Sequence, residues 1–552
     1  MSNELPVAFP HSADTSSDYN PGIRLNGKRF IKEQTILEFA VEFLSVIFSE
    51  KWLNTNENDD SEVINEPFPP FELIKGLTDN NELIYYRPPI KMNLKLFSFF
   101  SLSPVDSRHP VHQDHFRKLV NTLENKLNSN DGNVLEKVEL LEHLFHSFQG
   151  VGFNRTWCAQ TFFPISTKFL VQETIWNESN AKRNQVNSWD EAINSNNYFN
   201  TRKHIFMARG GELLYLQLCN LFTTKQSKID DFVKLMKLPA HESNIINLYN
   251  TLQQNLKLLE SPYIKTFNRF IEFIDGLDVE TQRSVNSNTG KLSCAWCPQE
   301  CWKEAMLFAI ELNRLMESVL DPVERIELLT TGCSLHVLRS ICAQSVRYTN
   351  GIVDVSHGGL LGYAWLFTSA NEVTRQQRLA SQRNLKTITG ILQKSLRNKS
   401  LIENAKSQTR IEIDKLLKEA DNRYGHKLFL YLGKKLGIIA PFKGPGARFI
   451  MTDSLLRYLV LVLLRPGEKC EYEDFLFRLY QQYGIAVESD YLDEAIYWNC
   501  LPVNNFVKNE NSSWFAQMLK AGGFLTELSD GCSLVQNDFK HKKTSLVDEV
   551  VK

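Results

Sequence analysis

The chain of 552 residues has no run of eighteen consecutive apolar residues, and its most apolar short stretch, Tyr458–Leu464, is far too short to cross a bilayer. The N-terminus also lacks the basic start and apolar centre of a secretory signal. Met1–Tyr19 is polar and contains Glu4, Asp14 and Asp18. We therefore expect no membrane partner and a cytoplasmic protein.

Cysteine and net charge are also scarce. Ten cysteines scattered over 552 residues do not form the dense framework of a disulfide-linked secreted domain, which favours a reducing cytosol. The 62 basic residues are balanced by 64 acidic ones, so the net charge is only −2. Because no global field draws such a protein toward nucleic acid, any binding must come from a local basic patch.

Catalytic signatures are missing too. The chain has no GxxxxGK[ST] phosphate loop, no GxSxG, no HExxH and no HxK…D pattern. Two glycine pairs do occur. Arg209-Gly210-Gly211-Glu212 stands at a helix start, where bare N–H groups could face an anion, whereas His357-Gly358-Gly359 is typical of a flexible connector. We expect no cofactor, no catalytic residues and no intrinsic NTPase activity.

What the chain does have is apolar periodicity. Apolar residues make up 43% of it, with 35 Phe, which indicates packed cores. Spacings of three and four residues predict a mostly α protein, and the length predicts several domains. We expect a flexible leader at 1–30, an N-terminal helical domain with minor β structure at 31–200, a central helical domain at 201–370, a basic helical tract at 371–440 and a further domain at 441–552.

Within these domains the pattern predicts particular elements. Strong helices are expected at Ile31–Trp52, Val111–Leu127 and Val134–Phe148. The minor β structure is expected at residues 82–102, where Leu83–Tyr86 and Leu94–Phe100 flank two prolines and could pair.

The basic tract is the most unusual local feature of the charge distribution. Fifteen basic and six acidic residues between Glu372 and Lys435 give a local charge of +9. The residues expected to contact phosphates are Arg375, Arg378, Arg383, Lys386, Lys394 and Arg397. The first four recur near helical-turn spacing, and such a stripe releases counterions when it binds a phosphate backbone. The alternative is a solvated helix pair that docks on an acidic surface of the same chain or of a partner.

Two clusters have metal-ligand residue types. Cys294, Cys297 and Cys301 are spaced to reach one ion, with Cys333 or His336 as a fourth ligand, but no second cysteine pair follows. Buried free cysteines next to Trp296 and Trp302 are the simpler interpretation. His109, His112 and His115, with His143 and His146 on the next helix, favour surface or capping histidines over a transition-metal site. We therefore expect no metal and keep the three cysteines as the candidates.

The last hundred residues show the most specific pattern. Helical patterns at Asp453–Leu464, Tyr472–Tyr483, Asp490–Trp498 and Ser512–Ala521 precede two alternating runs joined by Asp530-Gly531, a strong hairpin signal. In this order residues 441–540 resemble winged-helix domains. The resemblance implies that Ser512–Ala521 is the recognition helix, where Lys520 would contact nucleic acid, although the helix lacks Arg. We also expect residues 371–552 to fold largely alone.

The whole chain is similar in make-up to the large, mostly helical accessory subunits encoded beside helicases or nucleases in bacterial anti-phage defence operons. The first hypothesis is therefore a non-catalytic DNA-binding or DNA-sensing subunit of such a complex, with largely sequence-independent backbone contacts. A protein–protein scaffold subunit is the second hypothesis, because Trp514 and Phe515 suit an apolar partner groove. A diverged metal-dependent enzyme is the third.

Overall fold

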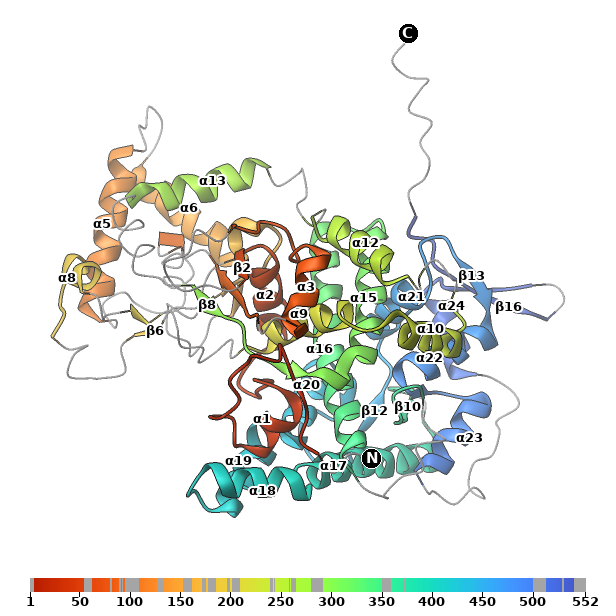
Figure 1. Ribbon diagram of the computed structural model, residues 1–552. Helices are drawn as coiled ribbons and strands as arrows, with labels where there is room; N and C mark the ends of the chain where they lie inside the picture. The colour runs from red at the N-terminus through yellow and green to blue at the C-terminus, as the bar shows by residue number, and fades with distance from the viewer. Residues whose placement is uncertain are drawn as a thin grey trace, which may run out of the picture.

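A computed structural model of the chain describes residues 4–53, 62–79, 82–88, 91, 93–94, 109–126, 133–151, 161–170, 175–176, 185–195, 199–200, 209–238, 242, 244–257, 259, 265–278, 291–349, 359–371, 373–499, 513–528 and 531–540. Most of these residues lie in helices, so the expected mostly α class is confirmed (Figure 1). Within the described ranges no helix combines the length and the apolar character that a membrane span requires.

The centre of the molecule is a bundle of four helices. They are α2 (Ile36–Ile47), α9 (Gly210–Phe222), α15 (Trp302–Glu317) and α16 (Pro322–Arg347). Every residue of α9 is buried, as expected for a helix that is apolar on most faces and enclosed by others. Three more helices cover this bundle: α3 (Phe71–Asp79), α10 (Gln226–Met236) and α12 (Ile245–Lys257).

A three-stranded antiparallel sheet closes one side of the bundle. Its order is β2 (Glu50–Leu53), β3 (Ile84–Arg87) and β8 (Leu292–Ser293). The predicted strand at Leu83–Tyr86 is therefore present, but its partners come from residues far away in the sequence. The rest of the expected pair, residues 95–100, lies outside the described residues. The predicted helix at Ile31–Trp52 is shorter than expected, because its last residues form β2.

The expected flexible leader is wrong for residues 4–30. β1 (Ala8–Phe9) pairs with β9 (Cys297–Pro298), and α1 (Pro21–Asn26) begins at the capping residue Asn20. Phe9 and Leu25 are fully buried. Asp18 is buried as well and accepts a hydrogen bond from the Trp296 Nε1 at 2.8 Å. The polar composition that suggested a loose segment instead supplies partners for buried polar groups.

A separate lobe has its own apolar core and projects from one side of the bundle (left in Figure 1). Its helices are α5 (Pro110–Lys126), α6 (Val134–Ser147), α8 (Trp189–Asn194) and α13 (Lys265–Asp275), with 3-10 turns η3 (Thr167–Phe169) and η5 (Gly276–Asp278). Two short hairpins pair β4 (Gln149–Val151) with β5 (Thr161–Phe162) and β6 (Ile175–Trp176) with β7 (Phe199–Asn200). The lobe is therefore built from two chain segments, one that precedes α9 and one that follows α12 in the sequence.

The predicted basic helical tract consists of four helices. They are α17 (Arg375–Ser395), α18 (Lys399–Gln408), α19 (Ile413–Arg423) and α20 (His426–Lys435); α17, α18 and α19 lie along the bottom of Figure 1, and α20 lies above them. α17 packs on a four-stranded sheet of order β11 (Ile439–Ala440), β12 (Arg448–Ile450), β10 (Trp365–Thr368) and β14 (Ile485–Ala486). β10 is parallel to both of its neighbours.

The C-terminal elements agree closely with the predicted ranges. The helices are α21 (Asp453–Leu463), α22 (Tyr472–Tyr483), α23 (Ser489–Trp498) and α24 (Trp514–Ala521). β15 (Leu525–Glu527) and β16 (Ser533–Gln536) form the expected hairpin, and β13 (Lys469–Glu471) adds a third antiparallel strand beside β16. Leu528 and Cys532 close the hairpin with a backbone hydrogen bond of 2.8 Å.

One apolar core joins most of these parts. It contains residues from Phe9 to Val535, including side chains of the central bundle, α17, α20 and the C-terminal helices. The expected boundaries near 370 and 440 therefore cross a shared core, because buried side chains on both sides of each boundary pack together.

Candidate nucleic-acid interface

Helix α17 carries its basic residues on one exposed face. A capping box fixes its start: the Thr374 side chain accepts from the Gln377 N–H, and the Gln377 side chain accepts from the Thr374 N–H. The opposite face buries Leu385, Ile388 and Ile391 against β10 and α16. The predicted contact residues are all exposed: Arg375, Arg378, Arg383, Lys386, Lys394 and Arg397. Five of them lie in α17, where about 3.6 residues per turn places them on one side of the helix, and Arg397 follows just after its end.

Five of these six cations are uncompensated within the described chain. The exception is Arg397, whose guanidinium donates to both carboxylate oxygens of Asp421 at 2.7 and 3.2 Å. These hydrogen bonds raise the pKa of Arg397. No described acid forms an ion pair with the side chains of Arg375, Arg378, Arg383, Lys386 or Lys394. Their charge is thus available to an anionic partner.

Arg448, which the sequence pattern missed, adds to this positive surface. It lies at the start of β12, and its guanidinium donates to the Thr368 Oγ1 at 3.3 Å and the Ala370 carbonyl at 3.1 Å. Partial burial, together with repulsion from Arg378, lowers the pKa of Arg448. Arg448 lies beside α17 only because β12 pairs with β10. The sequence shows Arg448 as an isolated basic residue, so no local pattern indicated that it belongs to this surface.

Three of the nine other cations of the basic tract form ion pairs within the described residues. Lys399 pairs with Glu403, Lys415 with Glu412 and Arg423 with both Glu33 and Glu419. Six cations outside α17 have no ion pair with a described acid either: Lys406, Arg410, Lys418, Lys427, Lys434 and Lys435. The five on α17 differ from these in lying on one side of a single helix.

In the C-terminal elements, Lys520 does not provide a free cation. It is exposed on α24 and pairs with Glu527 of β15 at 2.8 Å. On the inner face of α24, Phe515 and Leu519 are fully buried against the neighbouring helices and sheet. Because Glu527 compensates its charge, Lys520 should attract a phosphate less strongly than the cations of α17.

The three candidate cysteines lie in the core. Cys297 in β9 and Cys301 in η6 (Gln299–Cys301) have sulfur atoms 3.9 Å apart, and Cys294 is buried near them in sequence. Burial raises the pKa of the Cys294 and Cys297 thiols well above the usual range, which keeps them protonated. Among the described residues no three His, Cys, Asp or Glu side chains are arranged to hold a metal ion.

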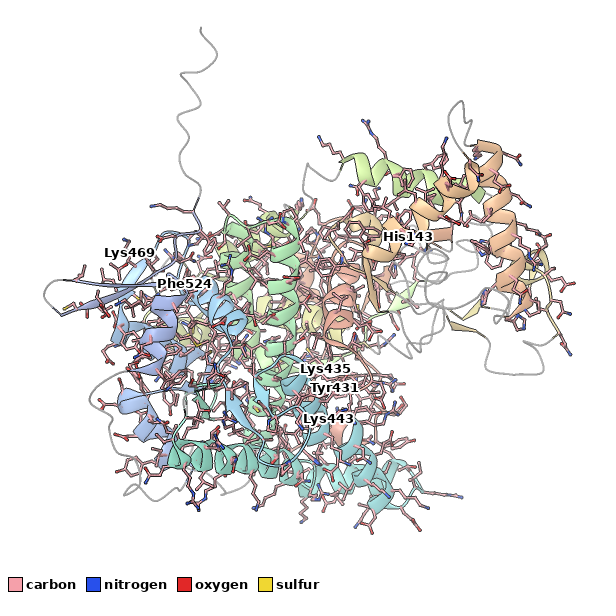
Figure 2. The ribbon with its side chains drawn as sticks, turned by 180° about the vertical axis from the view of Figure 1, so that it is seen from behind. His143, Tyr431, Lys435, Lys443, Lys469 and Phe524 are labelled. Atoms are coloured by element: carbon pink, nitrogen blue, oxygen red, sulfur yellow. The ribbon has the colours of Figure 1, made fainter. Side chains whose placement is uncertain are left out.

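The histidines are held by packing. His112 and His115 are buried in α5, and the ring of His115 stacks on Trp189 with centroids 3.5 Å apart. Burial, with a smaller contribution from Lys118, lowers the pKa of His115 well below its usual range. His143 is exposed on α6 (Figure 2), and the side chain of His146 lies outside the described residues. His336 hydrogen-bonds to Gln217 at 2.8 Å in the bundle.

The glycine pair at Gly210-Gly211 does face an anion, and that anion is Glu42 of the same chain. The Glu42 carboxylate accepts hydrogen bonds from the backbone N–H groups of Arg209 at 3.0 Å and Gly211 at 2.7 Å. Gln34 completes the set by donating to Glu42 at 2.9 Å. The N-terminus of α9 is therefore occupied by an internal carboxylate and is closed to a ligand.

An open groove of about 950 Å³ lies elsewhere on the molecule, beside the ends of α3, α9 and α16 and the start of α10. Five cations and two acids line it: Lys75, Lys225, Lys228, Lys303, Arg347, Asp79 and Glu300. Burial and repulsion from Arg347 lower the pKa of Lys303. None of the residues predicted as contacts lines this groove.

Comparisons of the chain with protein-family models, with curated proteins and with solved structures find no match. Any assignment of function therefore has to be argued from the residues of this chain.

Proposed function

We propose that the chain is a non-catalytic DNA-binding subunit of a multi-protein complex, and that the exposed face of α17 contacts the phosphate backbone. The observation that carries the proposal is that five cations on that face have no ion-pair partner among the described residues, in a chain with a net charge of −2. Phosphate contacts of this kind position a protein on DNA without reading its sequence. A role in anti-phage defence stays an expectation from the resemblance.

The C-terminal elements support a second part of the proposal, in which they orient the bound DNA. The winged-helix resemblance implied three helices followed by a hairpin. The structure has the order α21, β13, α22, α24, β15 and β16, with β14 and α23 between α22 and α24, and this order supports the proposal. Because Lys520 is paired with Glu527, we assign most of the affinity to α17 and only orientation to α24.

A scaffold function is the alternative that one observation favours. Leu140 and Leu144 on α6 are 68% and 38% exposed and lie one helical turn apart. Adjacent exposed leucines on a helix suit an apolar protein partner. A subunit of a complex can use both surfaces, so this observation is compatible with DNA binding through α17.

The test measures binding of the full chain to a fluorescein-labelled DNA duplex by anisotropy at several salt concentrations. The variant Arg378→Ala/Arg383→Ala/Lys386→Ala should bind at least about tenfold more weakly at low salt. Its salt dependence should flatten by about one unit in the logarithmic slope for each lost phosphate contact. The matched control removes three exposed lysines that each pair with a carboxylate: Lys75, Lys399 and Lys415.

The control should stay close to the wild type in both affinity and slope. Equal losses in the two triple variants would mean that α17 has no special role. No binding of the wild type to DNA would overturn the proposal and leave the scaffold alternative.

A further inference from the structure

The loop between β11 and β12 presents an unusual exposed aromatic residue. Its sequence is Pro441-Phe442-Lys443-Gly444-Pro445-Gly446-Ala447, and the first six residues are all exposed. The Phe442 side chain is 53% exposed. Gly444 and Gly446 adopt positive φ angles of 92° and 82°, which glycine permits at low cost. The backbone conformation of the loop therefore keeps the Phe442 ring exposed to solvent.

A lysine lies over this ring and over a second one. The Lys435 Nζ is 5.3 Å from the centroid of the Phe442 ring and 6.0 Å from that of Tyr431. Figure 2 shows Tyr431, Lys435 and Lys443 close together on the face turned away from Figure 1. In the part of the chain that the structure describes, neither Lys435 nor Lys443 has an ion-pair partner. Phe442, Lys435 and Lys443 are thus exposed beside the half-buried ring of Tyr431.

This patch is connected to the basic face of α17. The Gln382 side chain on α17 donates to the Gly446 carbonyl at 3.0 Å and fixes the end of the loop. The loop then enters β12 at Arg448, which is close enough to Arg378 for their charges to interact. These two contacts join the loop that carries Phe442 to α17.

We propose that the loop Pro441–Ala447 is a base-stacking platform, so that the preferred ligand has unpaired bases: a single strand, or a duplex with a single-stranded end. The inference rests on the proposed function and adds a ligand class to it. Bases inside a duplex already stack on one another and are not available to a side chain, whereas an unpaired base can stack on Phe442. Lys435 and Lys443 would contact the phosphates on either side of that base.

The experiment compares three labelled oligonucleotides with the full chain: a twenty-nucleotide oligothymidine, an abasic strand with the same number of phosphates, and a duplex of the same length. The wild type should bind oligothymidine about five- to 150-fold more tightly than the abasic strand, since one stacked base contributes about 1–3 kcal/mol. Phe442→Leu keeps an apolar side chain but removes the ring, so it should abolish this preference. Phe442→Tyr keeps an aromatic ring, so this variant should retain the preference for oligothymidine.

These outcomes separate the platform from the binding face. If the strands and the duplex all bind but oligothymidine and the abasic strand bind equally, backbone binding stands and the platform is wrong. The platform is also wrong if Phe442→Leu keeps the preference, because Phe442 then serves another partner such as a protein groove. If none of the three oligonucleotides binds, the proposed function fails as well.

Discussion

Glu42 lies fully enclosed between α2 and α9, and it accepts backbone hydrogen bonds from Arg209 and Gly211. Burial raises the pKa of this carboxyl from 4.5 to about 7, although the hydrogen bonds from Gln34 and Gly211 oppose the rise. The residue therefore titrates near neutral pH inside the core, where a carboxylate depends on its hydrogen bonds for stability.

The first prediction concerns the pH dependence that Glu42 gives to stability. Between pH 4.5 and about 7 the folded state holds a proton that the unfolded state releases, so the contribution of Glu42 to stability falls as pH rises through this window. The total change is at most about 3 kcal/mol. Glu42→Gln removes the titration while losing hydrogen bonds at every pH. The wild type therefore loses stability relative to the variant as pH rises. The melting temperature of Glu42→Gln minus that of the wild type should increase by a few degrees between pH 5 and pH 8.

Glu50→Gln is the control, because Glu50 is exposed at the start of β2. Its melting temperature should differ from that of the wild type by a constant amount over the same range. A constant difference for Glu42→Gln as well would show that Glu42 does not change its protonation near neutral pH.

At the scale of elements, the contact between α2 and α9 depends on the absence of a side chain at Gly211. A Cβ atom there would lie 2.4 Å from both the Phe39 carbonyl oxygen and the Phe43 backbone nitrogen. Backbone atoms of a buried helix cannot move aside without separating the two helices. Gly390, in contrast, lies in the exposed part of α17, and no atom would contact its Cβ within 4 Å.

The second prediction compares alanine at these two helical glycines. Gly211→Ala should destabilise the protein by on the order of 3 kcal/mol or more, because α2 must shift. Gly390→Ala should stabilise it by about 0.5–1 kcal/mol through higher helix propensity. Urea unfolding followed by circular dichroism measures both. Equal effects of the two substitutions would contradict the close packing of α2 on α9.

The elements that sequence reasoning located are those whose pattern is local. The C-terminal helices have clear apolar periodicity, and Asp530-Gly531 marks the hairpin, so both were predicted within a few residues. Pairing between distant segments was not predictable in this way. β3 joins β2 and β8, and β13 joins β16, through contacts that no short window of sequence contains.

The same division applies to the candidate site. The basic face of α17 was predictable because one helix carries it, and helical spacing brings its cations together. Arg448 and Phe442 belong to the same surface only because β12 pairs with β10 and Gln382 contacts Gly446. The sequence indicated that the N–H groups of the glycine pair could face an anion, but it could not indicate that Glu42 lies there, since 169 positions separate Gly211 from Glu42.

At the scale of the whole molecule, the C-terminal half depends on the central bundle. Arg314 of α15 is almost fully buried and donates to the Val462 and Leu463 carbonyls at the end of α21, at 2.7 and 2.8 Å. Glu311 of the same helix binds Arg339 of α16 and accepts from the Tyr458 hydroxyl at 3.4 Å. α21 is buried on most of its surface, and α15 and α16 cover part of it.

The third prediction reverses what the sequence suggested for residues 371–552. Expressed alone, this fragment should lack a cooperative thermal transition and should bind a hydrophobic dye, because α17 and α21 lose their apolar cover and the Val462 and Leu463 carbonyls lose Arg314. Mixing it with a separately expressed fragment 1–370 should restore a single cooperative transition, since the shared core then forms again between the two chains. Circular dichroism of each fragment and of the mixture measures this. A sharp transition in 371–552 alone would mean that the core can be divided at residue 370, and that the contacts of Arg314 and Glu311 with α21 contribute little to its folding.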